Sequence, residues 1–207
     1  MDQPFFANPY LITTVRLLIG LMFILSGIAK LQDPKGFTMA VYNFRILPNA
    51  LVELYATLIP YVELAAGVLL VIGLFTQLAA VVAFLTLLSF TLAIGWNLRR
   101  GERPDCHCFG NLFSEELSGV LVVRNTILMV ILLPVMVVPS VFFALQTVLW
   151  PAQYAAANLP WVDILPCLFL ALAGIAAVLL TGQISATISR SPWVESPWPS
   201  LIFWRKR

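Results

Sequence analysis

The chain reads LVELYATLIPYVELAAGVLLVIG over residues 51–73 and FTQLAAVVAFLTLLSFTLAIGWNL over residues 75–98. Each run is predominantly apolar and long enough to cross a membrane as a helix, because about 20 residues span the roughly 30 Å of hydrocarbon. Thr76 and Gln77 are the polar residues at the junction. The two runs therefore predict a tight antiparallel pair of transmembrane helices, in which Gly67 leaves room for a neighbouring helix.

Apolar runs of similar length lie on both sides of this pair. They predict further spans at about residues 10–31, 118–138 and 161–185. Of the 207 residues, 60% are hydrophobic and 11% are charged, against roughly 25% charged residues in a globular domain. We therefore predict an all-α polytopic membrane protein, with a four-helix bundle in residues 1–138 and a fifth transmembrane helix in residues 139–207. The net charge of +2 is too small to suggest nucleic-acid binding.

The connecting segments differ in character. Residues 33–50 predict an amphipathic helix in the membrane interface, which begins after the break at Asp33-Pro34 and is ended by Pro48. Residues 139–160 are apolar but rich in proline and aromatic residues, and they predict an interfacial segment or, alternatively, a short additional span. The tail beyond the last span is rich in tryptophan and proline and should lie along the membrane surface. The first four residues lack the features of a signal peptide, so the first span is expected to be retained.

The polar interval between the third and fourth spans holds two of the three cysteines, Cys106 and Cys108. A Cys-x-Cys pair can cycle between a dithiol and a disulfide, and positive charge nearby lowers the pKa of a thiol. That charge is supplied here by Arg99, Arg100 and Arg103. The one-residue spacing strains the oxidised ring, and strained disulfides are the labile, more oxidising kind. The sequence therefore predicts that Cys106 and Cys108 form a redox pair.

Two other interpretations of this loop stay open. The thiols could be incidental to an inert loop, or Cys106, His107 and Cys108 could be half of a metal site. A tetrahedral zinc site needs four ligands, usually with two or more residues between cysteines, so no metal is predicted. The third cysteine, Cys167, is expected about 30 Å away, at the opposite end of the membrane. A disulfide requires Cα atoms within about 7 Å, so Cys167 is predicted to be a small buried filler.

Glu63 lies near the middle of the second span, where a lone carboxylate is costly. Arg16 and Arg124 each lie about two turns inside their own spans, and either could reach toward Glu63. The three residues could form a buried ion pair that fixes the helix register. Alternatively, they could form a polar pocket that binds a quinone head group as a cofactor or carries protons. Both interpretations predict that Glu63 faces the interior of the bundle.

The order of the motifs along the chain is similar to that of a known family. The motifs are Arg16, Ser26-Gly27-x-x-Lys30, Phe44 to Pro48, Pro60-x-x-Glu63-x-x-x-Gly67, Arg100-Gly101, Cys106-x-Cys108-Phe109-Gly110 and Arg124-Asn125. Over about residues 10–135 the chain resembles the MauE branch of the DoxX-like membrane proteins. The resemblance implies a four-helix bundle in the bacterial cytoplasmic (inner) membrane, associated with thiol redox chemistry. It also implies a thioredoxin-like partner in making or repairing disulfides of exported proteins. His107 stands where the family has a small residue, which would change the redox potential.

Two functions follow from the residues and the resemblance. The first is a membrane thiol–disulfide oxidoreductase, in which Cys106 and Cys108 exchange electrons with a thioredoxin-like protein or with a quinone near Glu63. The second is a non-catalytic accessory subunit of a larger membrane complex. The fifth span and the tryptophan-rich tail lie outside the resemblance and would suit such a complex. A transporter is disfavoured, because the spans carry few charges and no evident pair of broken helices.

The distribution of lysine and arginine predicts an orientation. With five spans, the basic residues that follow the first, third and fifth spans share one side of the membrane, and the two other connections carry none. The positive-inside rule then places the N-terminus outside and the cysteine loop in the cytoplasm. This orientation conflicts with the exported disulfides that the resemblance implies, so the two expectations have to be separated by experiment.

Overall fold

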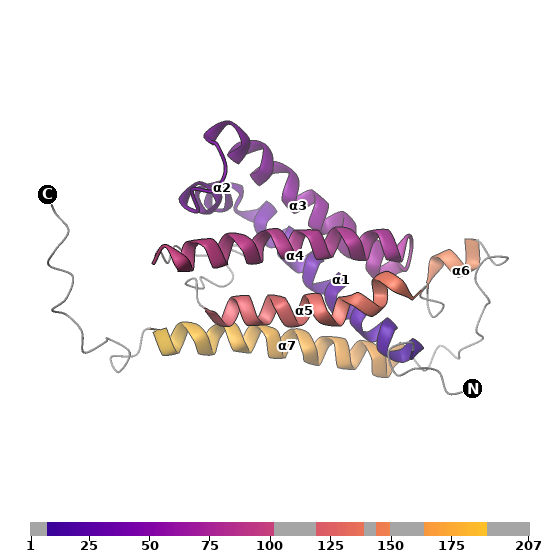
Figure 1. Cartoon of the computed structure of the whole chain (residues 1–207). Helices are drawn as coiled ribbons and strands as arrows, with labels where there is room; N and C mark the ends of the chain where they lie inside the picture. Colours follow the sequence, from indigo (N-terminus) through magenta and orange to yellow (C-terminus); the bar gives the residue numbers. More distant parts are fainter. Residues whose placement is uncertain (1–7, 102–118, 139–143, 150–163, 190–207) are drawn as a thin grey trace, which may run out of the picture.

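The computed structural model describes residues 8–101, 119–138, 144–149 and 164–189, and the elements in these ranges are all helices (Figure 1). They are α1 (Pro9–Gln32), α2 (Pro34–Asn43), α3 (Asn49–Ile72), α4 (Thr76–Arg99), α5 (Gly119–Val137), α6 (Leu145–Leu149) and α7 (Ile164–Ser189). Five of them, α1, α3, α4, α5 and α7, are long and apolar enough to cross a membrane. The prediction of an all-α protein with five membrane spans is therefore confirmed.

Short-range signals set the helix ends. The side chain of Asn8 caps α1 by accepting a hydrogen bond from the Tyr10 N–H at 3.0 Å. Asp33 stops α1 and caps α2, because its side chain accepts from the Gly36 N–H at 2.9 Å. Gly73 ends α3 with a φ of +72°, a left-handed conformation that glycine adopts without a Cβ clash. The predicted break after the first span and the predicted tight turn between the second and third spans are both confirmed.

α2 is the short amphipathic helix predicted between the first two spans. Its inner face is buried, whereas Met39 and Tyr42 on its outer face are at least half exposed. The predicted end at Pro48 is wrong, because α2 already ends at Asn43. Arg45 has a φ of +48°, and a right-handed helix cannot continue through that left-handed conformation.

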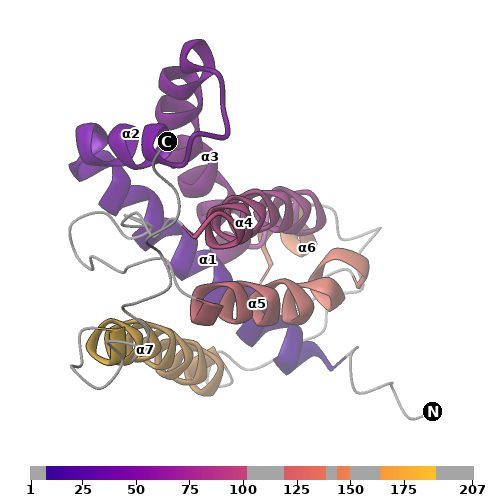
Figure 2. The same cartoon turned by 60° about the vertical axis from the view of Figure 1, so that its left-hand side comes forward.

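α1 is the central helix of the bundle and packs against α3, α5 and α7 (Figure 2). Its crossing with α3 is close because glycines face each other. A Cβ atom at Gly67 would lie 2.7 Å from the Gly20 carbonyl oxygen, and one at Gly20 would lie 3.0 Å from the Gly67 carbonyl oxygen. Small residues at such a crossing allow two helix backbones to approach each other. The surrounding core is apolar and includes Ile19, Phe23, Ala66, Leu70 and Leu132.

α6 docks on the turn between α3 and α4. The Gln146 N–H donates to the Gly73 carbonyl oxygen at 3.1 Å. The hydroxyl and the backbone N–H of Thr76 both donate to Gln146 Oε1, at 3.3 and 3.4 Å. With five residues α6 is too short to cross the membrane. The described part of the connection between α5 and α7 therefore agrees with the interfacial interpretation and contains no additional span.

The connections of the bundle divide between two ends (Figure 1). The start of α1, the α3–α4 turn, α6 and the start of α7 lie at one end. The other end, which we call the loop end, contains the helix termini at Gln32, Asn49, Arg99, Gly119 and Ser189, together with α2. Cys106 and Cys108 lie outside the described residues. Because their segment follows α4 and precedes α5, it is joined to the bundle at the loop end.

Candidate functional site

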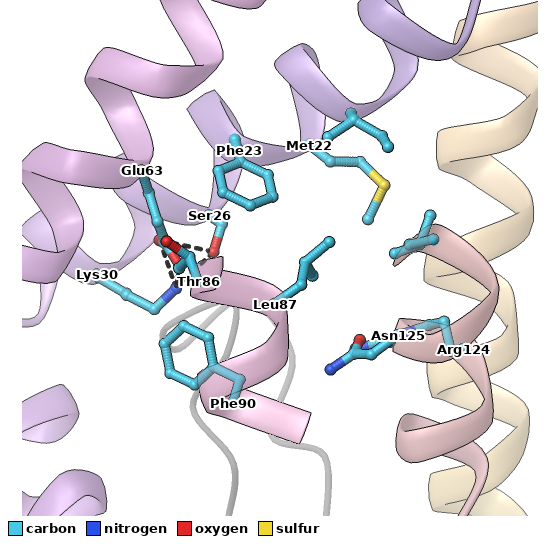
Figure 3. Close-up of a pocket in the computed structure, with 12 residues that line it drawn as sticks. Met22, Phe23, Ser26, Lys30, Glu63, Thr86, Leu87, Phe90, Arg124 and Asn125 are labelled. Carbon is cyan, nitrogen blue, oxygen red and sulfur yellow. Dashed lines mark hydrogen bonds and ion pairs between the residues drawn. The ribbon is translucent and has the colours of Figure 1, made fainter. Parts of the chain in front are cut away.

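Glu63 lies on the inner face of α3 and is 3% exposed. Lys30 Nζ lies 2.6 Å from its Oε2 and 2.9 Å from its Oε1. The Ser26 hydroxyl donates to Glu63 Oε2 at 3.1 Å and accepts from Lys30 Nζ at 2.5 Å. The carboxylate, the ammonium group and the hydroxyl therefore form a closed network between α1 and α3 (Figure 3).

The geometry of α1 explains how Lys30 reaches Glu63. Ser26 and Lys30 are four residues apart and therefore lie on one face of the helix. Because Cα–Cβ bonds tilt toward the N-terminus of a helix, the lysine side chain can run back along α1, past Ser26. Lysines near the ends of transmembrane helices usually extend outward to the interface. Lys30 instead turns inward, where the buried carboxylate binds it.

Two aromatic rings complete the surroundings of the ammonium group. Lys30 Nζ lies 5.4 Å from the ring centroid of Phe37 on α2 and 5.1 Å from that of Phe90 on α4. Both distances are within the range of about 6 Å over which a cation is attracted to an aromatic face. Lys30 is 1% exposed, and a charge at that depth has to be paired and hydrogen-bonded. The network therefore connects α1, α2, α3 and α4 at one point.

A pocket of about 50 Å³ lies beside this network. Arg124 and Asn125 of α5 lie across the pocket from Lys30 and Glu63 (Figure 3). A cavity needs about 10–15 Å³ of such volume to hold one water molecule, so the pocket has room for a few. An engineered cavity that binds benzene measures about 150 Å³, so a quinone ring would enter this pocket only if the lining side chains moved apart. The site can therefore hold water between the Lys30–Glu63 pair and the polar side chains of α5.

The structure brings together only part of the group predicted around Glu63. Glu63 faces the interior of the bundle, as predicted, and Arg124 lines the same pocket. Of the two arginines that could reach toward Glu63, Arg16 lies elsewhere in the bundle. At 1.5 Å per residue, Arg16 lies about 21 Å before Lys30 along α1. It is fully buried against Gly73, where an added Cβ atom would be 2.8 Å from Arg16 Nη1.

Lys30 is the member of this site that the sequence reasoning missed. Its position at the end of the first span made it a marker of membrane orientation and not a candidate partner for Glu63. The signal that could have found it is its four-residue spacing from Ser26. This spacing puts two polar side chains on one face of the otherwise apolar stretch 17–31.

Cys106, His107 and Cys108 lie outside the described residues, so their roles stay predictions. Their segment joins α4 to α5, and these two helices also supply Phe90 and Arg124 to the pocket. At 1.5 Å per residue, Phe90 lies about 14 Å from the end of α4 and Arg124 about 8 Å from the start of α5. The pocket therefore lies in the half of the bundle to which the cysteine segment is attached.

Cys167 is buried, as predicted. It packs against Leu17 of α1 and Ala171 of α7, and its Sγ lies 3.9 Å from the Tyr10 carbonyl oxygen. Because Tyr10 is at the start of α1, Cys167 lies at the end of the bundle opposite the loop end. Within the ranges that the structure describes, histidine, cysteine, aspartate and glutamate form no group of three that could hold a metal ion.

Comparison with known proteins finds one family. Residues 8–139 match the family model described as methylamine utilisation protein MauE. The chain is 35% identical over 125 residues to the methylamine utilization protein MauE of Paracoccus denitrificans, covering 60% of this chain and 67% of that protein. It is 35% identical over 126 residues to the protein of that name from Methylorubrum extorquens, covering 60% and 68%. The identity to the Paracoccus versutus protein is 32% over 127 residues, covering 61% and 68%. No solved structure matches the chain significantly.

The family match covers the parts of the chain discussed above. It includes α1 to α5, and with them the buried network, the pocket and the segment that contains Cys106 and Cys108. α6 and α7 follow it. The matched region is more than half of the sequence, and the chain belongs to the MauE family.

Proposed function

We propose that the protein is a membrane thiol–disulfide oxidoreductase, in which Cys106 and Cys108 exchange electrons with a thioredoxin-like partner. The observation that carries the proposal is the Cys-x-Cys sequence with three arginines within seven residues before it. Positive charge favours the thiolate, which is the reactive form of cysteine. The relatives are named for methylamine utilisation. We therefore assign the disulfides that the oxidoreductase makes or repairs to an exported protein of that process. The proposal includes membership of the DoxX-like branch and a place in the bacterial inner membrane.

The exchange balances because the loop dithiol is oxidised while the partner disulfide is reduced. The thiolate of one loop cysteine attacks a sulfur of the partner disulfide, a mixed disulfide forms, and the other partner sulfur leaves as a thiolate. The second loop cysteine then attacks the mixed disulfide and releases the partner as a dithiol. Two electrons pass from the loop to the partner, and the loop ends as the Cys106–Cys108 disulfide. The reverse sequence oxidises the partner and reduces the loop.

The pocket beside Glu63 has a supporting role in this proposal. A quinone ring would need the pocket to widen, because its volume of about 50 Å³ is well below the roughly 150 Å³ of a cavity that binds benzene. The electrons are therefore assigned to the thiol partner. The buried pair of Lys30 and Glu63 fixes the four helices around the attachment of the cysteine segment.

The test uses single and double serine variants of the loop in cells. A variant that keeps the attacking cysteine should accumulate a mixed disulfide with the partner, because the cysteine that would resolve it is missing. The double variant Cys106→Ser, Cys108→Ser should lose activity completely while its level in the membrane stays that of the wild type. Non-reducing gels and mass spectrometry of the trapped species provide the measurement. Cys167→Ala is the matched control and should change neither readout, because its thiol is buried at the other end of the bundle.

The rival function is a non-catalytic accessory subunit. α7 lies outside the family match and exposes large apolar side chains such as Leu165 and Phe169, a surface that either lipid or another membrane subunit would cover. Full activity of the double serine variant in cells would contradict the redox proposal and favour this second function.

The orientation of the loop end is a separate prediction. Basic side chains described at this end include Lys35, Arg45, Arg99 and Arg100, and the positive-inside rule places such an end in the cytoplasm. In a Cys167→Ala background, a membrane-impermeant maleimide should therefore label the reduced loop cysteines only after the membrane has been opened. Labelling in intact cells would contradict this orientation and would place the loop on the side of exported disulfides.

A further inference from the structure

A groove of about 640 Å³ lies between α2 and the first turns of α3. It is separate from the buried pocket, and its lining carries two opposite charges. Lys35 is on α2 and Glu53 is on α3, and both side chains are exposed. Among the described residues, Lys35 and Glu53 form no ion pair with each other or with another residue. The groove therefore presents a cation and an anion, with open space around them.

The position of the groove relates it to the membrane surface. α2 begins just beyond the end of the first span, and Glu53 lies in the first turns of the second span. The groove is therefore at the loop end, at the depth where a bilayer changes from head groups to hydrocarbon. Its polar lining is accompanied by the side chains of Met39, Tyr42 and Val52, so an occupant meets both charged and apolar groups.

The groove has exposed apolar side chains of its own. Met39 and Tyr42 line it on α2 and are 60% and 50% exposed. Lys35, Met39 and Tyr42 are spaced four and three residues apart, so they lie on one face of α2. A molecule whose charged part contacts Lys35 can therefore lay its apolar part against Met39 and Tyr42.

We propose that the groove binds the head group of an ethanolamine phospholipid. The Lys35 ammonium group contacts the phosphate, and the Glu53 carboxylate accepts hydrogen bonds from the primary ammonium group of the lipid. A charge-assisted hydrogen bond needs an N–H donor, which a choline head group lacks. A glycerol head group offers no cation, so Glu53 gains nothing from it and repels the phosphate. The acyl chains pack against Met39 and Tyr42 where they leave the groove.

The experiment is native mass spectrometry of the full-length, detergent-purified protein with added lipids. Phosphatidylethanolamine, phosphatidylcholine and phosphatidylglycerol with identical acyl chains are compared. The wild type should bind the ethanolamine lipid roughly three- to fivefold more tightly than either of the others, a ratio in the range of one water-exposed ion pair. Soluble phosphoethanolamine at the same concentration should not displace it, because the acyl chains contribute to binding.

Two variants test the contributions of the two charges one at a time. Lys35→Gln should weaken binding of all three lipids by a similar factor, roughly threefold, and Lys35→Arg should restore it. Glu53→Gln should remove the preference, because binding of the ethanolamine lipid becomes weaker and binding of the glycerol lipid becomes stronger. Arg45→Gln is the matched control, since it removes one positive charge from the loop end outside the groove, and it should leave the order of the lipids unchanged.

Three results would overturn the proposal. One is equal binding of the three lipids by the wild type. Another is an unchanged ratio of ethanolamine to glycerol lipid in Glu53→Gln. The third is equally tight binding of soluble phosphoethanolamine, which would make the lipid unnecessary. The side chains of Lys35 and Glu53 are exposed, so the variants are expected to keep the fold, and thermal unfolding curves verify this before the lipids are compared.

Discussion

Glu63→Leu is expected to lower the free energy of unfolding by about 3–5 kcal/mol, the effect of removing one partner from a buried ion pair. The substitution leaves the ammonium group of Lys30 buried with a hydroxyl and two aromatic rings but without a carboxylate. Glu63→Gln should be tolerated better, because the amide oxygen can still accept from Lys30 and Ser26. Thermal unfolding of the purified protein in detergent, together with the amount of folded protein in the membrane, provides the measurement.

The double variant Lys30→Met, Glu63→Leu shows whether the loss comes from the unpaired charge. Replacing both members of a buried pair with apolar side chains of similar size is often neutral or stabilising, so most of the lost stability should return. Glu53→Leu is the matched control, because it removes an exposed carboxylate from the same helix and should change stability by no more than about 0.5 kcal/mol. A double variant as unstable as Glu63→Leu would show that the pair acts through its polar contacts and not through charge compensation.

Gly67→Ala is expected to destabilise the protein by about 1–3 kcal/mol, the usual effect of adding atoms to a close-packed interface. The added Cβ atom would lie 2.7 Å from the Gly20 carbonyl oxygen and 2.9 Å from the Ile24 backbone nitrogen. Both neighbours are backbone atoms of α1, so the methyl group fits only if the two helices move apart. Because α1 is the central helix, that movement also changes its packing against α5 and α7.

Gly95→Ala provides the control for Gly67→Ala. A Cβ atom at Gly95 on α4 would meet no atom within 4 Å beyond the adjoining backbone of its own helix, so this variant changes helix propensity without a steric effect. Alanine is favoured over glycine in a helix interior by about 1 kcal/mol, and Gly95→Ala should be neutral or slightly stabilising. Equal unfolding temperatures for the two variants would show that the crossing of α1 and α3 can relax around a methyl group.

The helices could be predicted from the sequence because their determinants are local. A transmembrane span is an uninterrupted apolar run, and its ends follow from residues such as Asp33 and Gly73, which act within one turn. The end of α2 was not predictable in this way. Pro48 is a visible helix breaker, but the chain leaves the helix earlier, through the left-handed conformation of Arg45. Arginine has no intrinsic preference for that conformation, so the sequence carries no sign of it.

The candidate site was predictable in part. The cost of a lone carboxylate in hydrocarbon was enough to orient Glu63 toward the interior. Its partner was not predictable from depth alone, because a long side chain can bind several residues away from its own Cα atom. Lys30 reaches inward along α1, whereas Arg16, although deeper in the span, lies at the other end of the helix against Gly73. The choice among three cations depends on the crossing of α1 and α3, which is a tertiary property.

α7 returns the chain to the loop end of the bundle. The described part of the chain contains five candidate crossings, and the start of α1 and the end of α7 lie at opposite ends of the bundle (Figure 1). Ser189 is at the same end as Arg99 and Gly119, between which the cysteine segment lies. A thioredoxin-like domain fused directly after Ser189 would therefore be tethered on the side of that segment, and short flexible tethers give effective concentrations in the millimolar range. The same domain fused before α1 would be separated from the cysteines by the bilayer. The first fusion can therefore contact the cysteines, and the second cannot.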